Sequence, residues 1–247
     1  LAAATARGLA DAGCTVLNIG LAGTEEMYFA TSHFGADGGI EITASHNPIN
    51  YTGMKMVGLG SRPLDPATEL AQIRQMAEAA DFADAPVKGT LKPVGFAARA
   101  AYADKVMSFI EPSVLRPLKV VVNCGNGAAA PAYEAIKTRL QQHGAPLSFF
   151  DLFLEPDPAF PNGIPNPLLA ENQPATRDAV LAQGAEEGVG GLLAHVVDGN
   201  GPVAGKSAHG QSDVLAVLID DLSEIEIDVH QRTVSATSDA ADVAGHR

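Results

Sequence analysis

Residues 118–151, LKVVVNCGNGAAAPAYEAIKTRLQQHGAPLSFFD, decide the fold. They begin with the apolar run 118–123, continue through a glycine-containing turn, and then become rich in alanine over 128–143. Gly144 ends the expected helix, and a second apolar run occupies 147–151. A strand, a helix and a strand in this order make a βαβ unit, whose crossover helix joins parallel strands. The stretch therefore predicts an α/β fold built on a parallel sheet.

The sequence on either side of this unit also alternates between strand and helix patterns. Ala-rich residues 1–12 predict a helix that ends at Gly13. The other expected elements are a strand at 14–19, a helix at 24–34 with Thr24 as N-cap, strands at 39–43 and 54–57, a helix at 66–80 opened by Asp65, a linker or hairpin at 83–95, and helices at 98–110 and 174–183. We expect mixed, largely parallel sheets flanked by helices.

The composition argues against several classes of protein. The chain has 247 residues, a formal net charge of −13 and a pI of about 4.8. We expect no nucleic-acid partner, because phosphate backbones require basic surfaces. No signal peptide is recognised, and no apolar run approaches the roughly 18 residues that a membrane span needs. Cys14 and Cys124 both lie in apolar, strand-like contexts and are expected to be buried free thiols, which suits the reducing cytoplasm. We expect a monomer.

The chain divides into three segments. Prolines at 112 and 117 separate a first domain, 1–111, from a second, 117–188. Because the chain begins inside a helix pattern, we expect a fragment in which both domains are incomplete. All thirteen aromatic residues precede residue 188, and a core is hard to build without them. The tail, 189–247, is therefore expected to be poorly packed, disordered toward its end, or the product of an altered reading frame.

The motif TASHNP, residues 43–48, carries the clearest chemical signal. It forms a Pro-terminated turn that exposes the Ser45 hydroxyl beside the His46 imidazole, with Lys55 ten residues further on. The simplest interpretation is an ordinary turn, in which Ser, Asn and Pro are favoured. An acyl-transfer nucleophile of a serine hydrolase is disfavoured, because the G-x-S-x-G pattern is absent. A phosphoserine is the third interpretation, since Lys55 and a divalent ion could neutralise its charge.

Two further motifs have both a chemical and a structural interpretation. Residues 125–130 read G-x-G-x-x-A after a strand, and Asp151 ends the next strand, as in NAD-binding oxidoreductases of the Rossmann type. The same glycines also fit a tight βα turn without a nucleotide. Residues 198–201, DGNG, could present the Asp198 oxygens to Mg²⁺ or could simply form a turn.

Four stretches taken together resemble the α-D-phosphohexomutases, most closely the bacterial phosphomannomutase/phosphoglucomutase type. In chain order they are 23–31 (GTEEMYFAT), 38–55 around TASHNP, 122–128 (VNCGNGA) and 160–169 (FPNGIPNPLL). The resemblance covers about residues 1–188. It implies two phosphohexomutase-type domains, and it implies that the 125–130 turn is structural.

The resemblance also implies an activity, an intramolecular phosphotransferase that interconverts the 6- and 1-phosphates of mannose or glucose. A phosphoserine at Ser45 would donate its phosphoryl group to a hexose phosphate, and the bisphosphorylated sugar would return its other phosphoryl group. By this match His46 and Lys55 are catalytic beside Ser45, while Asn47 and Lys55 bind the substrate. Mg²⁺ would bind the serine phosphate and an aspartate loop, and a hexose 1,6-bisphosphate would act as activator and intermediate.

The sequence departs from this family in two respects. The family's metal loop, D-G-D-x-D-R, is absent where it is expected; Asp198 lies later in the chain and lacks the other aspartates and the arginine. Nothing resembles the family's third and fourth domains, which bind the rest of the sugar. We therefore expect little or no mutase turnover from this chain by itself. The alternative is a non-catalytic α/β module that binds phosphate.

Overall fold

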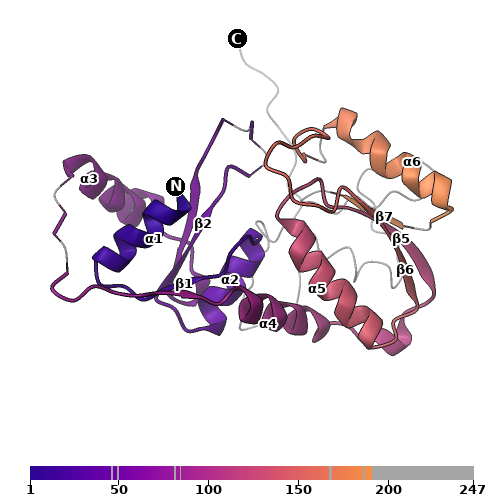
Figure 1. Cartoon of the computed structure of the whole chain (residues 1–247), viewed down its shortest axis with the longest axis horizontal. Coiled ribbons are helices and arrows are strands. Elements are labelled where there is room, and N and C mark those ends of the chain that lie inside the picture. The colour runs from indigo at the N-terminus through magenta and orange to yellow at the C-terminus, as the bar shows by residue number, and fades with distance from the viewer. Residues whose placement is uncertain are drawn as a thin grey trace, which may run out of the picture.

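The structure is a computed structural model, and it describes residues 1–190 apart from 46, 49, 81, 84, 167, 168 and 186. Figure 1 shows an N-terminal group of elements in indigo and purple and a second group in pink and orange. In the N-terminal group the helices and strands are α1 (Ala2–Asp11), β1 (Val16–Asn18), α2 (Thr24–His33), β2 (Gly38–Ile42), β3 (Met54–Gly58), α3 (Ala71–Ala79), β4 (Leu91–Pro93) and α4 (Gly95–Met107). The second group contains β5 (Leu118–Asn123), α5 (Ala129–Gln142), β6 (Leu147–Leu152), α6 (Gln173–Gln183) and β7 (Glu187–Gly190).

The strands of the described residues form three sheets, and these confirm the predicted α/β class. β5 lies between β6 and β7 and is parallel to both, as the βαβ pattern predicts. β1 is parallel to β4, whereas β2 and β3 are antiparallel. In this part of the chain, no helix combines the length and the apolar character that crossing a bilayer requires.

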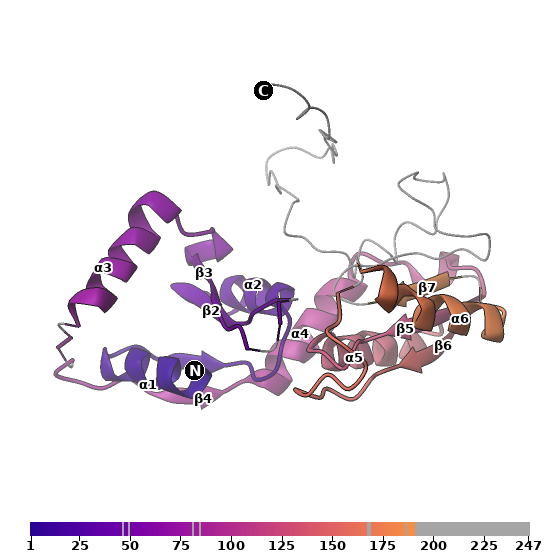
Figure 2. The ribbon, with the colours of Figure 1, turned by 90° about the horizontal axis from the view of Figure 1, so that it is seen from above.

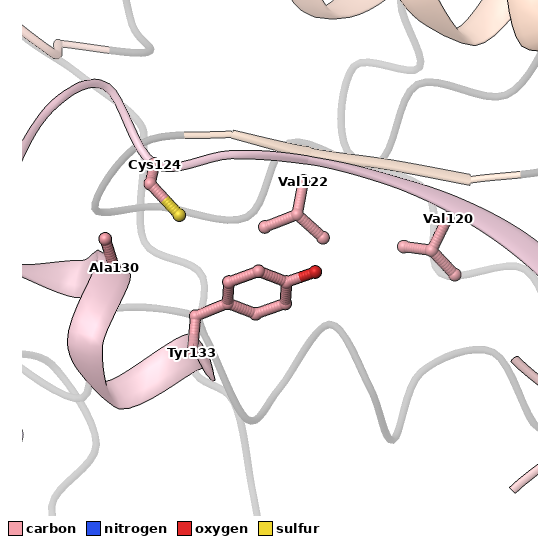
Figure 3. Packing of buried hydrophobic residues seen from close by; sticks show 5 residues of the cluster. All are labelled: Val120, Val122, Cys124, Ala130 and Tyr133. Carbon is pink, nitrogen blue, oxygen red and sulfur yellow. The ribbon is translucent and has the colours of Figure 1, made fainter. Parts of the chain in front are cut away.

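The central strand β5 is covered on both faces, because its side chains alternate between two helices. Val120, Val122 and Cys124 pack against Ala130 and Tyr133 of α5 (Figure 3). Val121 points to the opposite face, where it belongs to a buried cluster that includes Val180 of α6. A strand buried on both faces is a continuous apolar run, which is why the sequence of β5 identifies it.

The sequence does not predict β7, although this strand completes the parallel sheet. A β-carbon added to Gly188 would lie 2.5 Å from Cγ2 of Val180. Glycine at this position therefore allows α6 to pack directly on the sheet. The expected tail, 189–247, is described only as far as Gly190, so the structural expectations for it lie outside the described residues.

In the N-terminal group, α2 packs against the β2–β3 hairpin, and Figure 2 shows the helix beside both strands. A β-carbon on Gly39 would lie 2.2 Å from Oγ1 of Thr31 and 2.6 Å from Sδ of Met27. Gly39 therefore permits a close approach between strand and helix. Because Val57 is opposite Gly39 in the register, the same face of the hairpin carries the buried Val57 side chain.

Two expectations for this group are wrong. The stretch 83–95 is not a hairpin: it contains β4, which pairs in parallel with β1. The N-cap of α2 is Gly23 rather than Thr24, and the Gly23 N–H donates to the carboxylate of Glu26 at 3.0 Å. A carboxylate three residues into the helix therefore replaces the expected threonine hydroxyl as the capping group. The cap predicted at Asp65 is confirmed, since its carboxylate accepts the Thr68 N–H at 2.8 Å.

The two cysteines differ in exposure, so the expectation that both are buried is right for Cys124 and wrong for Cys14. The Cys14 N–H donates to the Leu9 carbonyl oxygen at 2.9 Å, which places the residue in the turn after α1 rather than in a strand. Burial raises the pKa of the Cys124 thiol to about 12, and the neighbouring Asp151 and Glu134 carboxylates contribute.

We expect iodoacetamide to alkylate Cys14 and to spare Cys124 while the chain is folded. The reactive species is the thiolate, and Cys124 is both inaccessible and protonated near neutral pH. Peptide mass spectrometry after timed alkylation measures the two rates. The same reaction in concentrated guanidinium is the control and should modify both residues. Equal rates in the folded chain would contradict the buried position of Cys124.

Candidate active site

The β2–β3 hairpin carries the TASHNP motif in its loop. Ile42 pairs with Met54 at the end of the ladder. Beyond this pair the Thr43 N–H donates to the Gly53 carbonyl oxygen at 3.1 Å. A β-carbon on Gly53 would lie 3.0 Å from the Thr43 carbonyl oxygen, so glycine suits this closure. The hairpin pairing therefore closes at Thr43 and Gly53, and the described residues between them project from it as a loop.

Ser45 is exposed in this loop and has a left-handed backbone conformation, with φ of 53°. Its N–H donates to Oγ1 of Thr43 at 2.9 Å. The Ala44 carbonyl oxygen accepts two bonds from Asn47, one from its N–H at 3.1 Å and one from its side-chain Nδ2 at 2.7 Å. Local bonds of this kind stabilise a conformation that costs a non-glycine residue free energy. The loop thus presents the Ser45 side chain to solvent, and Asn47 helps to shape it.

Lys55 lies on β3 and belongs to the same face of the hairpin as Val57, toward α2. It is two ladder positions from the Thr43–Gly53 closure, or about 7 Å along the strand. A lysine side chain is long enough to span that distance. The side chain is half-buried, and among the described residues it makes no hydrogen bond or ion pair. Lys55 is therefore a partly desolvated cation near the base of the Ser45 loop.

Glu41 is directly opposite Lys55 in the register, on the same face. Burial, with added repulsion from Glu26 and Glu25, raises the pKa of the Glu41 carboxyl to about 7, and Lys55 opposes this rise. A carboxyl with this pKa changes its charge near neutral pH. The site therefore contains a titrating group across the ladder from Lys55.

Glu26 of α2 lies beneath the hairpin. Its carboxylate is buried, and neighbouring groups compensate its negative charge. Its carboxylate accepts a bond from Nε of Arg99 in α4 at 3.2 Å, and the Gly23 N–H donates to it from the other side. Burial raises the pKa of the Glu26 carboxyl, while the Gly23 N–H and the Arg99 charge limit the rise. Arg99 also donates to the Leu21 carbonyl oxygen. The Arg99–Glu26 ion pair thus joins α4 to the helix that supports the hairpin.

Two of the predicted site residues, His46 and Asp198, lie outside the described residues, so the structure places neither. Of the predicted metal ligands only Ser45 is described. Within the described ranges no three His, Cys, Asp or Glu side chains are grouped so that they could hold a metal ion. Binding of Mg²⁺ through a phosphate on Ser45 therefore stays a prediction from the sequence.

The G-x-G-x-x-A turn has structural contacts in place of a nucleotide. A β-carbon on Gly125 would lie 2.4 Å from Cβ of Pro165, so the turn packs against the loop that follows β6. The Asp151 carboxylate accepts bonds from the Tyr133 hydroxyl at 2.6 Å and from Nζ of Lys137 at 2.5 Å. These contacts occupy the carboxylate that the NAD interpretation assigns to ribose. They favour the structural interpretation of the turn.

The sequence motif suggests Ser45 and Lys55 as site residues but gives no indication of the charged groups near them. Glu41 interrupts the apolar run Gly39–Ile42, and this single charge in a strand that is otherwise apolar is the signal that could have revealed it. No local pattern indicates that Arg99 meets Glu26, because the two residues lie on different helices.

Known proteins resemble both parts of the chain. The family described as "Phosphoglucomutase/phosphomannomutase, alpha/beta/alpha domain I" matches residues 1–84, and its domain II counterpart matches residues 100–192. A phosphomannomutase from Salmonella montevideo is 50% identical over 188 residues, which cover 75% of this chain and 41% of that protein. A phosphomannomutase from Escherichia coli K12 is 49% identical with the same coverage. The chain thus spans about two fifths of the length of these relatives.

A solved structure agrees with these sequence matches. A phosphoglucomutase/phosphomannomutase family protein from Burkholderia thailandensis superimposes with a TM-score of 0.67 at 29% identity. The superposition covers 81% of this chain and 43% of the other. With both domain descriptions matched in order, the chain belongs to the phosphoglucomutase/phosphomannomutase family of α-D-phosphohexomutases.

Proposed function

We propose that this chain carries the phosphoserine site of a mutase that interconverts hexose 6-phosphate and hexose 1-phosphate, with mannose or glucose as the sugar. Ser45 is the residue that carries the phosphoryl group. The observation that supports this most directly is that an exposed Ser45 loop and Lys55 lie on the same hairpin. Lys55 is a half-buried cation that forms no ion pair with any described residue. The relatives from Salmonella montevideo and Escherichia coli K12 are phosphomannomutases, which agrees with the substrate class.

The reaction consists of two phosphoryl transfers, and the phosphoryl group on Ser45 is restored at the end. In the first, a sugar hydroxyl oxygen attacks the phosphorus, the bond from phosphorus to Oγ of Ser45 breaks, and the hydroxyl proton passes to the serine oxygen. In the second, the bisphosphorylated sugar returns its other phosphoryl group to Ser45, and the proton returns to the sugar. Lys55 stabilises the negative charge on the transferring group, because a fixed cation in a partly desolvated site interacts strongly with it.

The proposal includes Mg²⁺ and a hexose 1,6-bisphosphate, as the family resemblance implies. Mg²⁺ would neutralise charge on the serine phosphate. His46 is proposed as a catalytic neighbour of Ser45, Asn47 as a substrate contact, and Asp198 as a metal ligand. A monomer in the cytoplasm is proposed as well, and the free thiols Cys14 and Cys124 support the cytoplasmic location.

A second candidate function is a phosphate-binding module without turnover. It is favoured by the lack, within the described ranges, of a side-chain group that could hold a metal ion. The two candidates differ in whether Ser45 becomes covalently phosphorylated.

Incubation with glucose 1,6-bisphosphate and Mg²⁺, followed by intact and peptide mass spectrometry, separates them. The expected result is one phosphate per chain, located on Ser45. A folded chain that retains no covalent phosphate would contradict the proposed function and leave the binding module. The same experiment with mannose 1,6-bisphosphate compares the two sugars.

Lys55→Met is expected to slow the phosphorylation of Ser45 by about a hundredfold, because it removes a preorganised charge from the transferring phosphoryl group. The rate is measured by quenching the reaction and quantifying the Ser45 peptide. Lys92→Met, which removes an exposed lysine from β4, is the matched control and should leave the rate unchanged. Equal rates in the Lys55→Met and Lys92→Met variants would remove Lys55 from the site.

A further inference from the structure

Glu41 is a charged side chain that the proposed chemistry does not use. It lies in β2, on the face of the hairpin toward α2, directly across the ladder from Lys55. The neighbouring residues on this face, Gly39 and Val57, are uncharged, and Gly39 lies close to α2. A carboxylate that is partly buried in such a place needs a compensating charge.

The charged groups near Glu41 belong to α2, to β3 and, behind α2, to α4. From α2, the carboxylates of Glu26 and Glu25 repel it, and from β3, Lys55 attracts it. Behind Glu26 lies Arg99 of α4, which is already bonded to that carboxylate. Burial, together with repulsion from the two α2 carboxylates, also raises the pKa of Tyr102 in α4. Lys55 is therefore the cation that acts on Glu41, and no described carboxylate forms a direct ion pair with it.

A phosphoryl group on Ser45 would introduce a second, stronger anion near the same ammonium. Lys55 is within side-chain reach of the loop base, about 7 Å along the strand from the Thr43–Gly53 closure. A phosphate monoester carries close to two negative charges at neutral pH and attracts an ammonium more strongly than one carboxylate does. Two anions would then compete for one cation.

We propose that Glu41 is a positioning residue that acts as the resting counter-charge of Lys55, and that it competes with a phosphoryl group on Ser45 for this ammonium. This inference rests on the proposed function. When the phosphoryl group arrives, Lys55 shifts its interaction to it, and Glu41 takes up one proton from solvent. When the phosphoryl group leaves, Glu41 releases the proton and again compensates Lys55.

The sign of the resulting pH dependence follows from the titration of Glu41. Lys55 lowers the pKa of Glu41, which stands at about 7, so withdrawal of Lys55 raises that pKa. Phosphorylation is then coupled to proton uptake, and low pH favours the phosphorylated state. If the pKa of Glu41 rises by about one unit on phosphorylation, the phosphorylation equilibrium changes about tenfold across the titration.

The test compares the equilibrium phosphorylation of Ser45 in the unmodified chain and in Glu41→Gln. Each is equilibrated with a fixed ratio of glucose 1,6-bisphosphate to glucose 6-phosphate and with Mg²⁺, from about pH 6 to about pH 8.5, a range centred on the titration of Glu41. The fraction of phosphorylated Ser45 is read by mass spectrometry. Because ionisation of the sugars affects both proteins alike, the ratio of their equilibrium constants isolates Glu41.

At high pH, where glutamate competes for Lys55, we expect the equilibrium constant for Ser45 phosphorylation to be about tenfold larger in Glu41→Gln than in the unmodified chain. At low pH the two constants should become equal. Glu78→Gln, which removes an exposed carboxylate from α3, is the matched control and should match the unmodified chain at every pH. In a second measurement, carbon NMR of the Glu41 carboxyl should show a higher pKa in Lys55→Met.

Each alternative outcome has a distinct meaning. A ratio that does not change with pH, in a chain whose Ser45 is phosphorylated, overturns the role of Glu41 and leaves the proposed function intact. A Glu41 pKa that is unaffected by Lys55→Met also overturns it. Absence of phosphate from Ser45 in the unmodified chain overturns the proposed function, and the inference with it.

Discussion

Replacing Ser45 by alanine is expected to abolish covalent phosphorylation of the chain, a loss of at least a hundredfold. The variant has no Oγ, so no bond to phosphorus can form at this position. The fold should remain, since Ser45 is exposed and its backbone bond to Thr43 uses the N–H that alanine keeps. Mass spectrometry after incubation with glucose 1,6-bisphosphate measures the phosphate, and circular dichroism measures the fold.

Two companion variants separate the chemistry from the shape of the loop. Ser45→Gly also lacks the hydroxyl but adopts the observed φ of 53° without the left-handed penalty of about 1 kcal/mol. Both variants should therefore be unphosphorylated, although glycine should be the more stable. Ser113→Ala, which removes another exposed hydroxyl, should be phosphorylated normally. Phosphate that persists on Ser45→Ala would place the acceptor at another residue.

Replacing Arg99 by methionine is expected to destabilise the N-terminal group of elements by about 3–5 kcal/mol at about pH 8. The substitution leaves the Glu26 carboxylate, which is 5% exposed, buried without its cation. Removing one partner of a buried pair costs far more than removing one of a surface pair, because the remaining charge is not solvated. Urea unfolding followed by circular dichroism measures the effect.

The destabilisation should shrink as the pH falls. Burial already raises the pKa of Glu26 above its ordinary value of 4.5, and loss of Arg99 raises it further. A carboxyl whose pKa is higher in the folded state destabilises the fold progressively as the pH rises from the unfolded value through the folded value. At about pH 5 a larger fraction of Glu26 should be protonated in the variant than at about pH 8, so the difference from the unmodified chain should be smaller.

Arg74→Met is the matched control for this prediction. It breaks the Arg74–Glu78 pair, whose side chains are 80% and 64% exposed, and should cost less than about 0.5 kcal/mol at either pH. A loss for Arg99→Met that is as small as the control, or that does not depend on pH, would show that the Arg99–Glu26 pair does not stabilise α2 against α4.

Most secondary-structure elements were predictable because each has a local cause. The apolar run of β5, the glycine after α5 and the cap at Asp65 all act within a few residues. The errors occur where a distant segment decides the result. Residues 91–93 become a strand because β1 offers a parallel partner, and Cys14 is exposed because it belongs to the turn that ends α1.

The candidate site divides in the same way. Ser45, Asn47 and Lys55 could be proposed from the sequence because they belong to one continuous segment whose turn chemistry depends on its own residues, and their roles stay predictions. Glu41 was not, because its importance depends on the register that sets it opposite Lys55 and on the α2 carboxylates that raise its pKa. His46 and Asp198 remain predictions from the sequence.

By itself the sequence determined the α/β class, the order of most elements and the segment that carries the serine, since periodicity, caps and turn residues act over short distances along the chain. Only the tertiary structure decided which charges share a face. The pairing of Glu41 with Lys55 and the contact of Glu26 with Arg99 arise from strand register and helix packing. Burial and electrostatic interaction depend on separation in space, and residues far apart in sequence acquire that proximity only when the chain folds.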